Sequence, residues 1–168
     1  MLWLIGMMGS GKSTVGTHVA EKLGWDFVDT DLLIASVTES SIPDLWRQRG
    51  EGQFRRLESQ MIASAAAGDP VVVATGGGAV LEPDNIAVMR DSGLVIWLAA
   101  SPRVLAARIG RDSNRPLLAE SPDPVGELER LLAERRPRYE EASHAVVDTD
   151  GKQIVEVANE VMDLWNAS

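Results

Sequence analysis

Short apolar runs recur along the chain, and stretches with helical spacing of apolar residues separate them. The first run, residues 2–5, ends at Gly6. Beyond it, Val15, Val19 and Leu23 lie on one face of a predicted helix. Further apolar runs follow at residues 27–28, 71–74, 94–98 and 145–147. Alternating strands and helices predict an α/β chain whose parallel sheet is covered by helices on both faces.

The stretches between the strands contain signals that begin and end helices. Ser41 can cap a short helix that Gly50 ends. The next helix, residues 51–67, ends before Gly68. Further helices are expected to begin at residues 12, 83 and 102, and to cover residues 125–139 and 152–165. The segment 110–124 has three prolines and little periodicity, which predicts a long loop of the kind that often serves as a lid.

The length and composition restrict the class of protein. The 168 residues suit one domain, 1–168, and a formal charge of -9 argues against a general nucleic-acid coat or an anionic membrane surface as partner. The chain has no cysteine, which excludes disulfides, thiolate zinc sites and cysteine nucleophiles. No apolar run approaches the ~20 residues of a membrane span, so a cytoplasmic protein is expected. His144 has no metal-like partners and is expected to be structural or on the surface.

One motif indicates a phosphate-binding loop. Residues 6–13 read Gly-Met-Met-Gly-Ser-Gly-Lys-Ser and match G-x-x-x-x-G-K-[ST] between a predicted strand and a predicted helix. The glycines let backbone N–H groups converge on a polyphosphate at the helix N-terminus. Lys12 would reach the β- and γ-phosphates, and the Ser13 hydroxyl would bind Mg²⁺. Hydrolases, switches and kinases share this loop, so it does not identify a reaction.

Two acids follow the second predicted strand. Asp29 and Asp31 lie near the carboxyl end of that strand, where open α/β sheets bind ligands. One acid could hold a metal-bound water while the other orients a hydroxyl and accepts its proton. The alternative is a turn with two solvated acids, or an N-cap for a helix over residues 32–37. The pattern leaves both open.

Three glycines and the pair of Arg55 with Glu58 indicate a candidate site for the acceptor. Residues 76–78 are all glycine, and close approach of a ligand to bare backbone explains them well, with a flexible connection as the alternative. Glu58 is placed to hold the guanidinium of Arg55, although an ordinary surface pair more often explains this spacing. Trp46, near the same helix, is a plausible wall of a pocket.

Further arginines flank the predicted loop. Arg108 precedes it, Arg115 lies within it, and Arg135 and Arg136 follow it. Planar guanidinium groups match carboxylate and phosphate oxygens, so this arrangement suggests a clamp that closes over anions. A solvated, charged helix face is the alternative.

Taken in order, these motifs resemble those of the shikimate kinases, small P-loop enzymes of the nucleoside-monophosphate-kinase-like fold. The resemblance covers about residues 2–165 and rests on six segments, residues 9–14, 29–31, 54–58, 76–79, 115–118 and 135–139. Each segment alone is weak, but six in sequence are specific. The implied fold is a three-layer α/β/α P-loop kinase with a five-stranded parallel sheet of order 2-3-1-4-5. A substrate lobe is implied over about residues 31–60, and a lid over about residues 110–124.

The resemblance also implies a reaction and its residues. The γ-phosphoryl group of ATP would pass to the 3-hydroxyl of shikimate, a step of chorismate and aromatic amino-acid biosynthesis. Shikimate would be bound by Asp31, Arg55, Gly76, Gly77, Gly78 and Arg135, with the two arginines on its carboxylate and Asp31 on its ring hydroxyls. ATP would be bound by Gly9, Ser10, Gly11, Lys12, Ser13, Thr14, Arg108, Arg115 and Lys152, with Arg108 stacked on adenine. Mg²⁺ would be served by Ser13 directly and by Asp29. Asp31, Lys12 and Arg115 are the implied catalytic residues, with Asp31 as the base.

Two departures and two rival functions remain at this point. Met7 and Met8 occupy variable positions of the loop, and Trp46 replaces a smaller aromatic residue, which puts the shape of the pocket in doubt. A gluconate or other small-molecule kinase would use the arginines for a different anion. A catalytically inactive homologue would bind ATP without transfer. Family habit favours a monomer.

Overall fold

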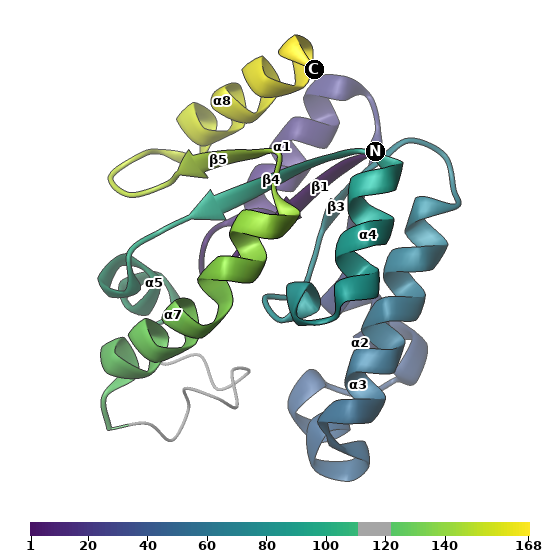
Figure 1. The fold of residues 1–168 in the computed structure, drawn as a ribbon, viewed down its shortest axis with the longest axis vertical. Coiled ribbons are helices and arrows are strands. Elements are labelled where there is room, and N and C mark those ends of the chain that lie inside the picture. The colour runs from purple at the N-terminus through teal and green to yellow at the C-terminus, as the bar shows by residue number, and fades with distance from the viewer. Residues whose placement is uncertain (111–121) are drawn as a thin grey trace.

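A central parallel sheet organises the computed structural model, which describes residues 1–110 and 122–168 (Figure 1). Its strands are β1 (Leu2–Ile5), β2 (Asp26–Asp29), β3 (Val71–Ala74), β4 (Leu94–Ala99) and β5 (Ala145–Asp148). They are all parallel and lie in the order β2-β3-β1-β4-β5, which confirms the predicted order. The inner strands β1 and β3 are buried along their whole length, because helices cover both faces of the sheet.

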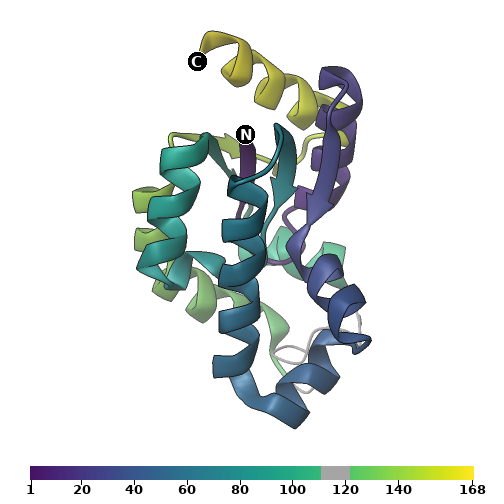
Figure 2. The ribbon, with the colours of Figure 1, turned by 90° about the vertical axis from the view of Figure 1, so that its right-hand side faces the viewer.

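The helices divide between the two faces of the sheet. They are α1 (Lys12–Leu23), α2 (Thr30–Thr38), α3 (Ile42–Ala66), α4 (Pro83–Ser92), α5 (Pro102–Ile109), α7 (Pro124–Ala142) and α8 (Ile154–Ala167), with a short 3-10 turn, η1 (Ala79–Leu81). Helices α1 and α8 cover one face, and α3, α4 and α7 cover the other (Figures 1 and 2). Along β1, Trp3 and Leu4 point into different cores, as alternation along a strand requires.

Several helix bounds differ from the prediction for local reasons. Helix α2 begins at Thr30, before the expected residue 32, because the Asp29 carboxylate caps it from the end of β2. Helix α8 begins at Ile154 and not at 152, because a capping box formed by Gln153 and Glu156 fixes its start. Helix α7 extends to Ala142, which is buried in the core.

The predicted break at Gly50 is present inside α3. The backbone of Gly50 has φ 77° and ψ 165°, so the helical conformation is interrupted there although one helix is assigned across it. The first part of α3 begins at Ser41, whose hydroxyl accepts a hydrogen bond from the N–H of Asp44 at 3.2 Å. This part of α3 and α2 together form a lobe that projects from the sheet (Figure 2).

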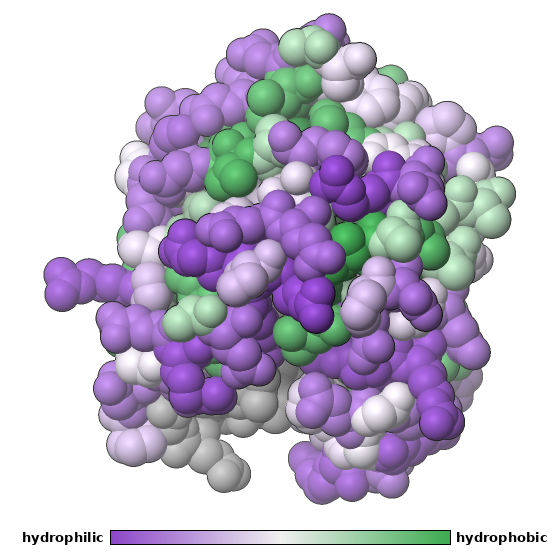
Figure 3. Space-filling model, viewed as in Figure 1, coloured by the Kyte–Doolittle hydropathy of each residue, from purple (hydrophilic) through white to green (hydrophobic). Residues whose placement is uncertain are grey.

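The face of the molecule that carries α4 and α7 is largely hydrophilic, with apolar side chains visible between the helices (Figure 3). No helix within residues 1–110 or 122–168 is both long and apolar enough to cross a membrane. The predicted lid, residues 110–124, lies mostly outside the described residues, and Arg115 lies there with it.

Candidate active site

The predicted phosphate loop joins β1 to α1. Gly6, Gly9 and Gly11 have φ angles of 142°, 78° and 94°, a conformation that favours glycine. The Lys12 ammonium donates to the carbonyl oxygens of Gly6 and Met7, both at 2.9 Å. Helix α1 begins at Lys12, so its N-terminal N–H groups face the loop. The loop therefore has the backbone geometry and the positive charge that an anion requires.

Asp29 connects this loop to α2, and the predicted N-cap is confirmed. Its Oδ1 accepts hydrogen bonds from the N–H groups of Asp31 at 3.0 Å and Leu32 at 3.3 Å, so the residue is the N-cap of α2. Its Oδ2 accepts a hydrogen bond of 2.5 Å from the hydroxyl of Ser13, at the start of α1. The cap thus holds one carboxylate oxygen beside the phosphate loop.

These two oxygens fit a magnesium ion that a nucleotide also coordinates. Mg²⁺ prefers oxygen ligands and is commonly held by one or two protein groups together with substrate phosphates. Ser13 is exposed and Asp29 is half-buried, so both can reach an ion from solvent. Within the described ranges, no three His, Asp or Glu residues cluster to hold a metal unaided. The two protein oxygens alone do not complete the coordination of Mg²⁺, so phosphate oxygens and water would supply the other ligands.

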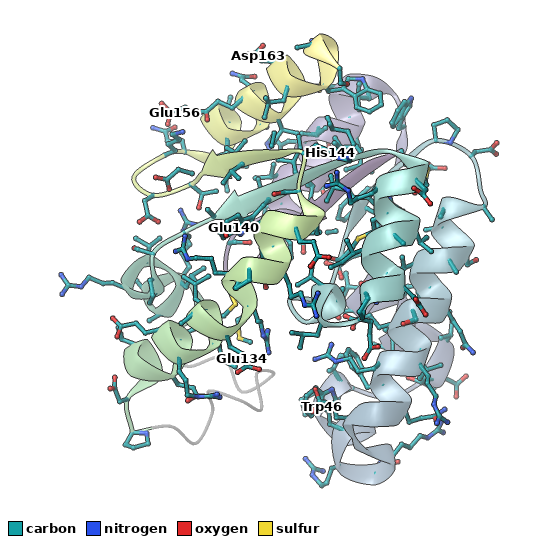
Figure 4. All side chains as sticks on the ribbon, viewed as in Figure 1. Trp46, Glu134, Glu140, His144, Glu156 and Asp163 are labelled. Carbon is teal, nitrogen blue, oxygen red and sulfur yellow. The ribbon has the colours of Figure 1, made fainter. Side chains whose placement is uncertain are left out.

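A cavity of about 430 Å³ extends from the phosphate loop to the lobe. It is lined by the residues predicted for the phosphate, the metal and the acceptor, namely Lys12, Ser13, Asp29, Asp31, Arg55, Gly76, Gly77, Gly78 and Arg135. Trp46 and Phe54 also line it, and Trp46 lies on the side of α3 that faces α7 (Figure 4). The guanidinium carbon of Arg55 lies 5.8 Å from the Trp46 ring centroid and 5.3 Å from that of Phe54. The sequence prediction of Trp46 as a pocket wall is confirmed.

The Arg55–Glu58 pair is a buried ion pair, and its interpretation as an ordinary surface pair is wrong. Nη1 of Arg55 donates to Oε2 of Glu58 at 2.7 Å, and the Glu58 side chain is 0% exposed. Burial raises the pKa of Glu58 to about 7, and the positive charge of Arg55 limits the rise. The pair is buried because the glycine segment 76–78 packs directly on it.

The three glycines leave room for side chains of other elements. A Cβ at Gly76 would collide with carboxylate oxygens of Glu58 and Asp31, and a Cβ at Gly78 would collide with the guanidinium of Arg55. In the structure the groups that approach these glycines closely are side chains of the site, whereas the approach of a ligand to their backbone stays a prediction. The N–H of Gly76 also donates to the hydroxyl of Thr30 at 3.0 Å, which ties the segment to α2.

Helix α7 supplies the second arginine of the cavity. Arg135 is buried, with 5% of its surface exposed, and its Nη1 donates to the carbonyl of Gly77 at 3.2 Å. Arg136 points elsewhere, with its guanidinium carbon 5.6 Å from the Trp97 ring centroid. Tyr139, one turn beyond Arg135, also donates to the Gly77 carbonyl, at 2.5 Å. Sequence reasoning missed this contact, although a tyrosine four residues after Arg135 lies on the same helix face.

The residues predicted for adenine lie outside this cavity and meet at Thr149. Arg108 donates to the hydroxyl of Thr149 at 2.8 Å and to its carbonyl at 2.6 Å. Lys152 follows in the same turn, where its N–H lies 3.4 Å from the Thr149 carbonyl and its ammonium pairs with Glu160 at 2.7 Å. Both side chains are therefore fixed on the α5 and α8 side of the phosphate loop.

His144 is structural, as predicted. It lies between the end of α7 and β4 (Figure 4), where its Nδ1 accepts the N–H of Val95 at 3.0 Å. Its own N–H donates to the Val95 carbonyl at 2.8 Å. Burial lowers the pKa of His144, which agrees with a neutral ring that accepts a hydrogen bond.

Comparison with known proteins agrees with this site. The family model described as "Shikimate kinase" matches residues 8–166. A curated shikimate kinase from Symbiobacterium thermophilum is 45% identical over 161 residues, which cover 95% of this chain and 92% of that protein. The solved structure of a shikimate kinase from Acinetobacter baumannii in complex with shikimate superposes with a TM-score of 0.95 at 34% identity, covering 99% of this chain and 92% of the other.

A gluconokinase from Sinorhizobium meliloti is also similar in structure, with a TM-score of 0.60 at 22% identity and coverage of 99% of this chain and 96% of the other. That similarity shows a shared fold alone. By contrast, the family model and the curated relative match nearly the whole chain, and the relative is 45% identical in sequence. This chain therefore belongs to the shikimate kinase family.

Proposed function

We propose that this protein transfers the γ-phosphoryl group of ATP to the 3-hydroxyl of shikimate and releases ADP and shikimate 3-phosphate. One observation carries the proposal: Lys12 of the phosphate loop lines the same cavity as Arg55 and Arg135. A phosphate donor and an anionic acceptor can therefore meet in one space. Although the chain has a formal charge of -9, three cations gather in this one cavity, where they balance the carboxylates of Asp29, Asp31 and Glu58.

The two arginines suit the carboxylate of the acceptor. A guanidinium offers parallel N–H donors that match a carboxylate, and both arginines are held in place before any ligand arrives. Glu58 holds Arg55, and the Gly77 carbonyl holds Arg135. An acceptor carboxylate between them would be fixed relative to the phosphate loop, which lowers the entropic cost of the transfer.

Asp31 is the proposed base. It lies in the first turn of α2, lines the cavity, and comes close to Gly76. In the transfer, the acceptor oxygen attacks the γ-phosphorus while the bond from that phosphorus to the β–γ bridging oxygen breaks and ADP leaves. Asp31 aligns the hydroxyl and accepts its proton, which then passes to solvent.

Lys12, Ser13 and Asp29 are proposed to act on ATP, the phosphate donor. Lys12 stabilises the negative charge that spreads over the transferred group, and Arg115, which lies outside the described residues, is proposed to assist it. Ser13 and Asp29 are the proposed ligands of Mg²⁺, Asp29 through a bound water. When bound, Mg²⁺ neutralises charge on the β- and γ-phosphate oxygens. Gly9, Ser10, Gly11 and Thr14 complete the proposed phosphate contacts, and Arg108 and Lys152 the proposed adenine contacts.

Water competes with shikimate as a nucleophile, so the site must exclude it during transfer. Segment 110–124 is proposed to act as a lid for this purpose. Trp46 and Phe54 already give the lobe side of the cavity an apolar wall. A single domain, a monomeric state and a cytoplasmic location stay predictions.

A coupled assay of ADP release with Mg-ATP tests the proposal. We expect ADP release that depends on shikimate and is absent with gluconate or nucleoside monophosphates. ADP release with gluconate instead would favour the rival kinase. ATP binding without ADP release for any acceptor would identify an inactive homologue and contradict the proposal.

A further inference from the structure

The carbonyl of Gly77 receives two hydrogen bonds from α7. The hydroxyl of Tyr139 donates to it at 2.5 Å, and Nη1 of Arg135 donates to it at 3.2 Å. Both donors are buried, at 0% and 5% exposure. Gly77 itself is half-buried at the cavity wall, and a hydrogen bond to its carbonyl contributes about 0.5–1.5 kcal/mol.

The Gly77 peptide also touches the phosphate loop. A Cβ built at Gly77 would lie 3.3 Å from the nitrogen of Met8 and 3.4 Å from the carbonyl oxygen of Gly6. The peptide is therefore packed between α7 and the loop that binds the donor. A displacement of Gly77 would change the distance between the acceptor site and the phosphate site.

Tyr139 is itself fixed. Its ring stacks on Trp97 of β4, with centroids 5.3 Å apart and planes at 18°. Burial raises the pKa of Tyr139 to about 12, so its hydroxyl remains protonated and able to donate at neutral pH. A close-packed ring of this kind cannot follow a moving partner without a cost to the core.

Tyr139 and Arg135, the two hydrogen-bond donors to Gly77, differ in their proposed contact with the acceptor. Under the proposed function, Arg135 binds the acceptor carboxylate, which competes with the Gly77 carbonyl for its N–H groups. Tyr139 does not itself line the cavity, and its hydroxyl contacts the Gly77 carbonyl and Arg135, which do. While Arg135 turns toward the acceptor, Tyr139 can keep the carbonyl bonded.

We infer that Tyr139 is a positioning residue for the acceptor: its hydroxyl holds the half-buried Gly77 carbonyl in place when Arg135 turns to bind the acceptor carboxylate. The inference rests on the proposed function, since it needs an anionic acceptor at Arg135. It goes beyond that function because it assigns a role to a side chain that lies outside the cavity.

Tyr139→Phe tests the inference, since it removes the hydroxyl and keeps the ring on Trp97. We expect the KM for shikimate to rise about tenfold and the KM for ATP to stay within about twofold of wild type. Ser92→Ala is the matched control, because Ser92 lies far from the cavity and accepts the indole N–H of Trp3 at 3.0 Å. It should lower the Tm while both KM values stay unchanged.

Other results would overturn the inference. If Tyr139→Phe leaves both KM values unchanged, or raises both in parallel with its loss of Tm, the hydroxyl is only structural. If wild type shows no shikimate-dependent ADP release, the proposed function fails and the inference fails with it. If wild type is active and Tyr139→Phe has wild-type KM values, the inference fails while the proposed function stands.

A second measurement serves if Tyr139→Phe does not fold. Tyr139 is the single tyrosine of the chain, so wild type labelled with ¹³C at the tyrosine Cζ gives one signal. We expect this signal to shift as shikimate is added, because Arg135 leaves the shared carbonyl. A signal that stays in place at saturating shikimate would contradict the inference.

Discussion

Glu58 lies one turn after Arg55 in α3, with its Oε2 2.7 Å from Nη1 of that arginine and its side chain 0% exposed. The glycine segment 76–78 packs against the pair, and the same arginine forms part of the cavity wall. The pair therefore couples the stability of the fold to the charge of the acceptor site.

The titration of Glu58 should appear in the stability of the protein. Burial raises its pKa from 4.5 to about 7, so between these values the folded chain binds more protons at this group than the unfolded chain does. Its contribution to the free energy of unfolding is full below pH 4.5 and is lost as the pH rises through about 7. Glu58→Gln cannot titrate, so its free energy of unfolding should fall less than that of wild type between pH 5 and pH 8.

Urea unfolding of both proteins across this range measures the difference. Glu141→Gln is the control, because Glu141 pairs with Arg138 at 2.8 Å on the exposed surface of α7. This control should follow the wild-type profile. Equal pH profiles for wild type and Glu58→Gln would show that Glu58 does not titrate in this range.

Substitution of the proposed base should separate binding from turnover. Asp31→Asn keeps the size and the polarity of the side chain but removes its capacity to accept a proton. We expect kcat to fall by a factor of ~10² or more. The affinity for ATP, measured by calorimetry, should stay nearly unchanged because Lys12 and the loop carry the phosphate contacts. Unchanged turnover would show that another group is the base.

Two substitutions of Asp29 should distinguish its role as the N-cap of α2 from the role of its negative charge in Mg²⁺ binding. Asp29→Asn retains an oxygen that can accept the N–H groups of α2, so the free energy of unfolding should change little. Its loss of charge should raise the Mg²⁺ concentration needed for half-maximal activity. Asp29→Ala removes both functions and should also destabilise the protein by about 1 kcal/mol. An Asn variant with wild-type Mg²⁺ dependence would argue against Asp29 in the metal site.

A methyl group at Gly78 should disturb the acceptor site specifically. In Gly78→Ala the new Cβ collides with the Arg55 guanidinium, so we expect the KM for shikimate to rise about tenfold or more. Gly52→Ala is the control within α3, where a Cβ meets no atom within 4 Å. It should keep wild-type kinetics and gain about 0.5–1 kcal/mol of stability. Wild-type shikimate kinetics in Gly78→Ala would show that the position of Arg55 does not matter.

The sheet and the phosphate loop could be predicted because their signals are local. Each strand is a short apolar run, and the loop joins β1 to α1 through a spacing that has few other uses. The start of α2 lies two residues before the predicted one, because the sequence pattern does not show which nearby N–H groups the Asp29 carboxylate accepts. The structure shows that one carboxylate caps the helix and contacts Ser13 at once.

The burial of the acceptor site could not be predicted from spacing. Glu58 at three residues from Arg55 has the same spacing as an exposed pair, such as Arg138 and Glu141. Only the packing of residues 76–78 against α3, two elements far apart in the chain, separates the two cases. The contact of Tyr139 with Gly77 joins residues 62 positions apart and is hidden from sequence for the same reason.

Product analysis by ³¹P NMR tests the central claim most directly. Wild type incubated with Mg-ATP and shikimate should form one phosphomonoester of shikimate for every ADP released, with no inorganic phosphate in excess of a shikimate-free control. ADP accompanied by inorganic phosphate, or ATP left intact, would contradict a cavity that joins the donor to an anionic acceptor.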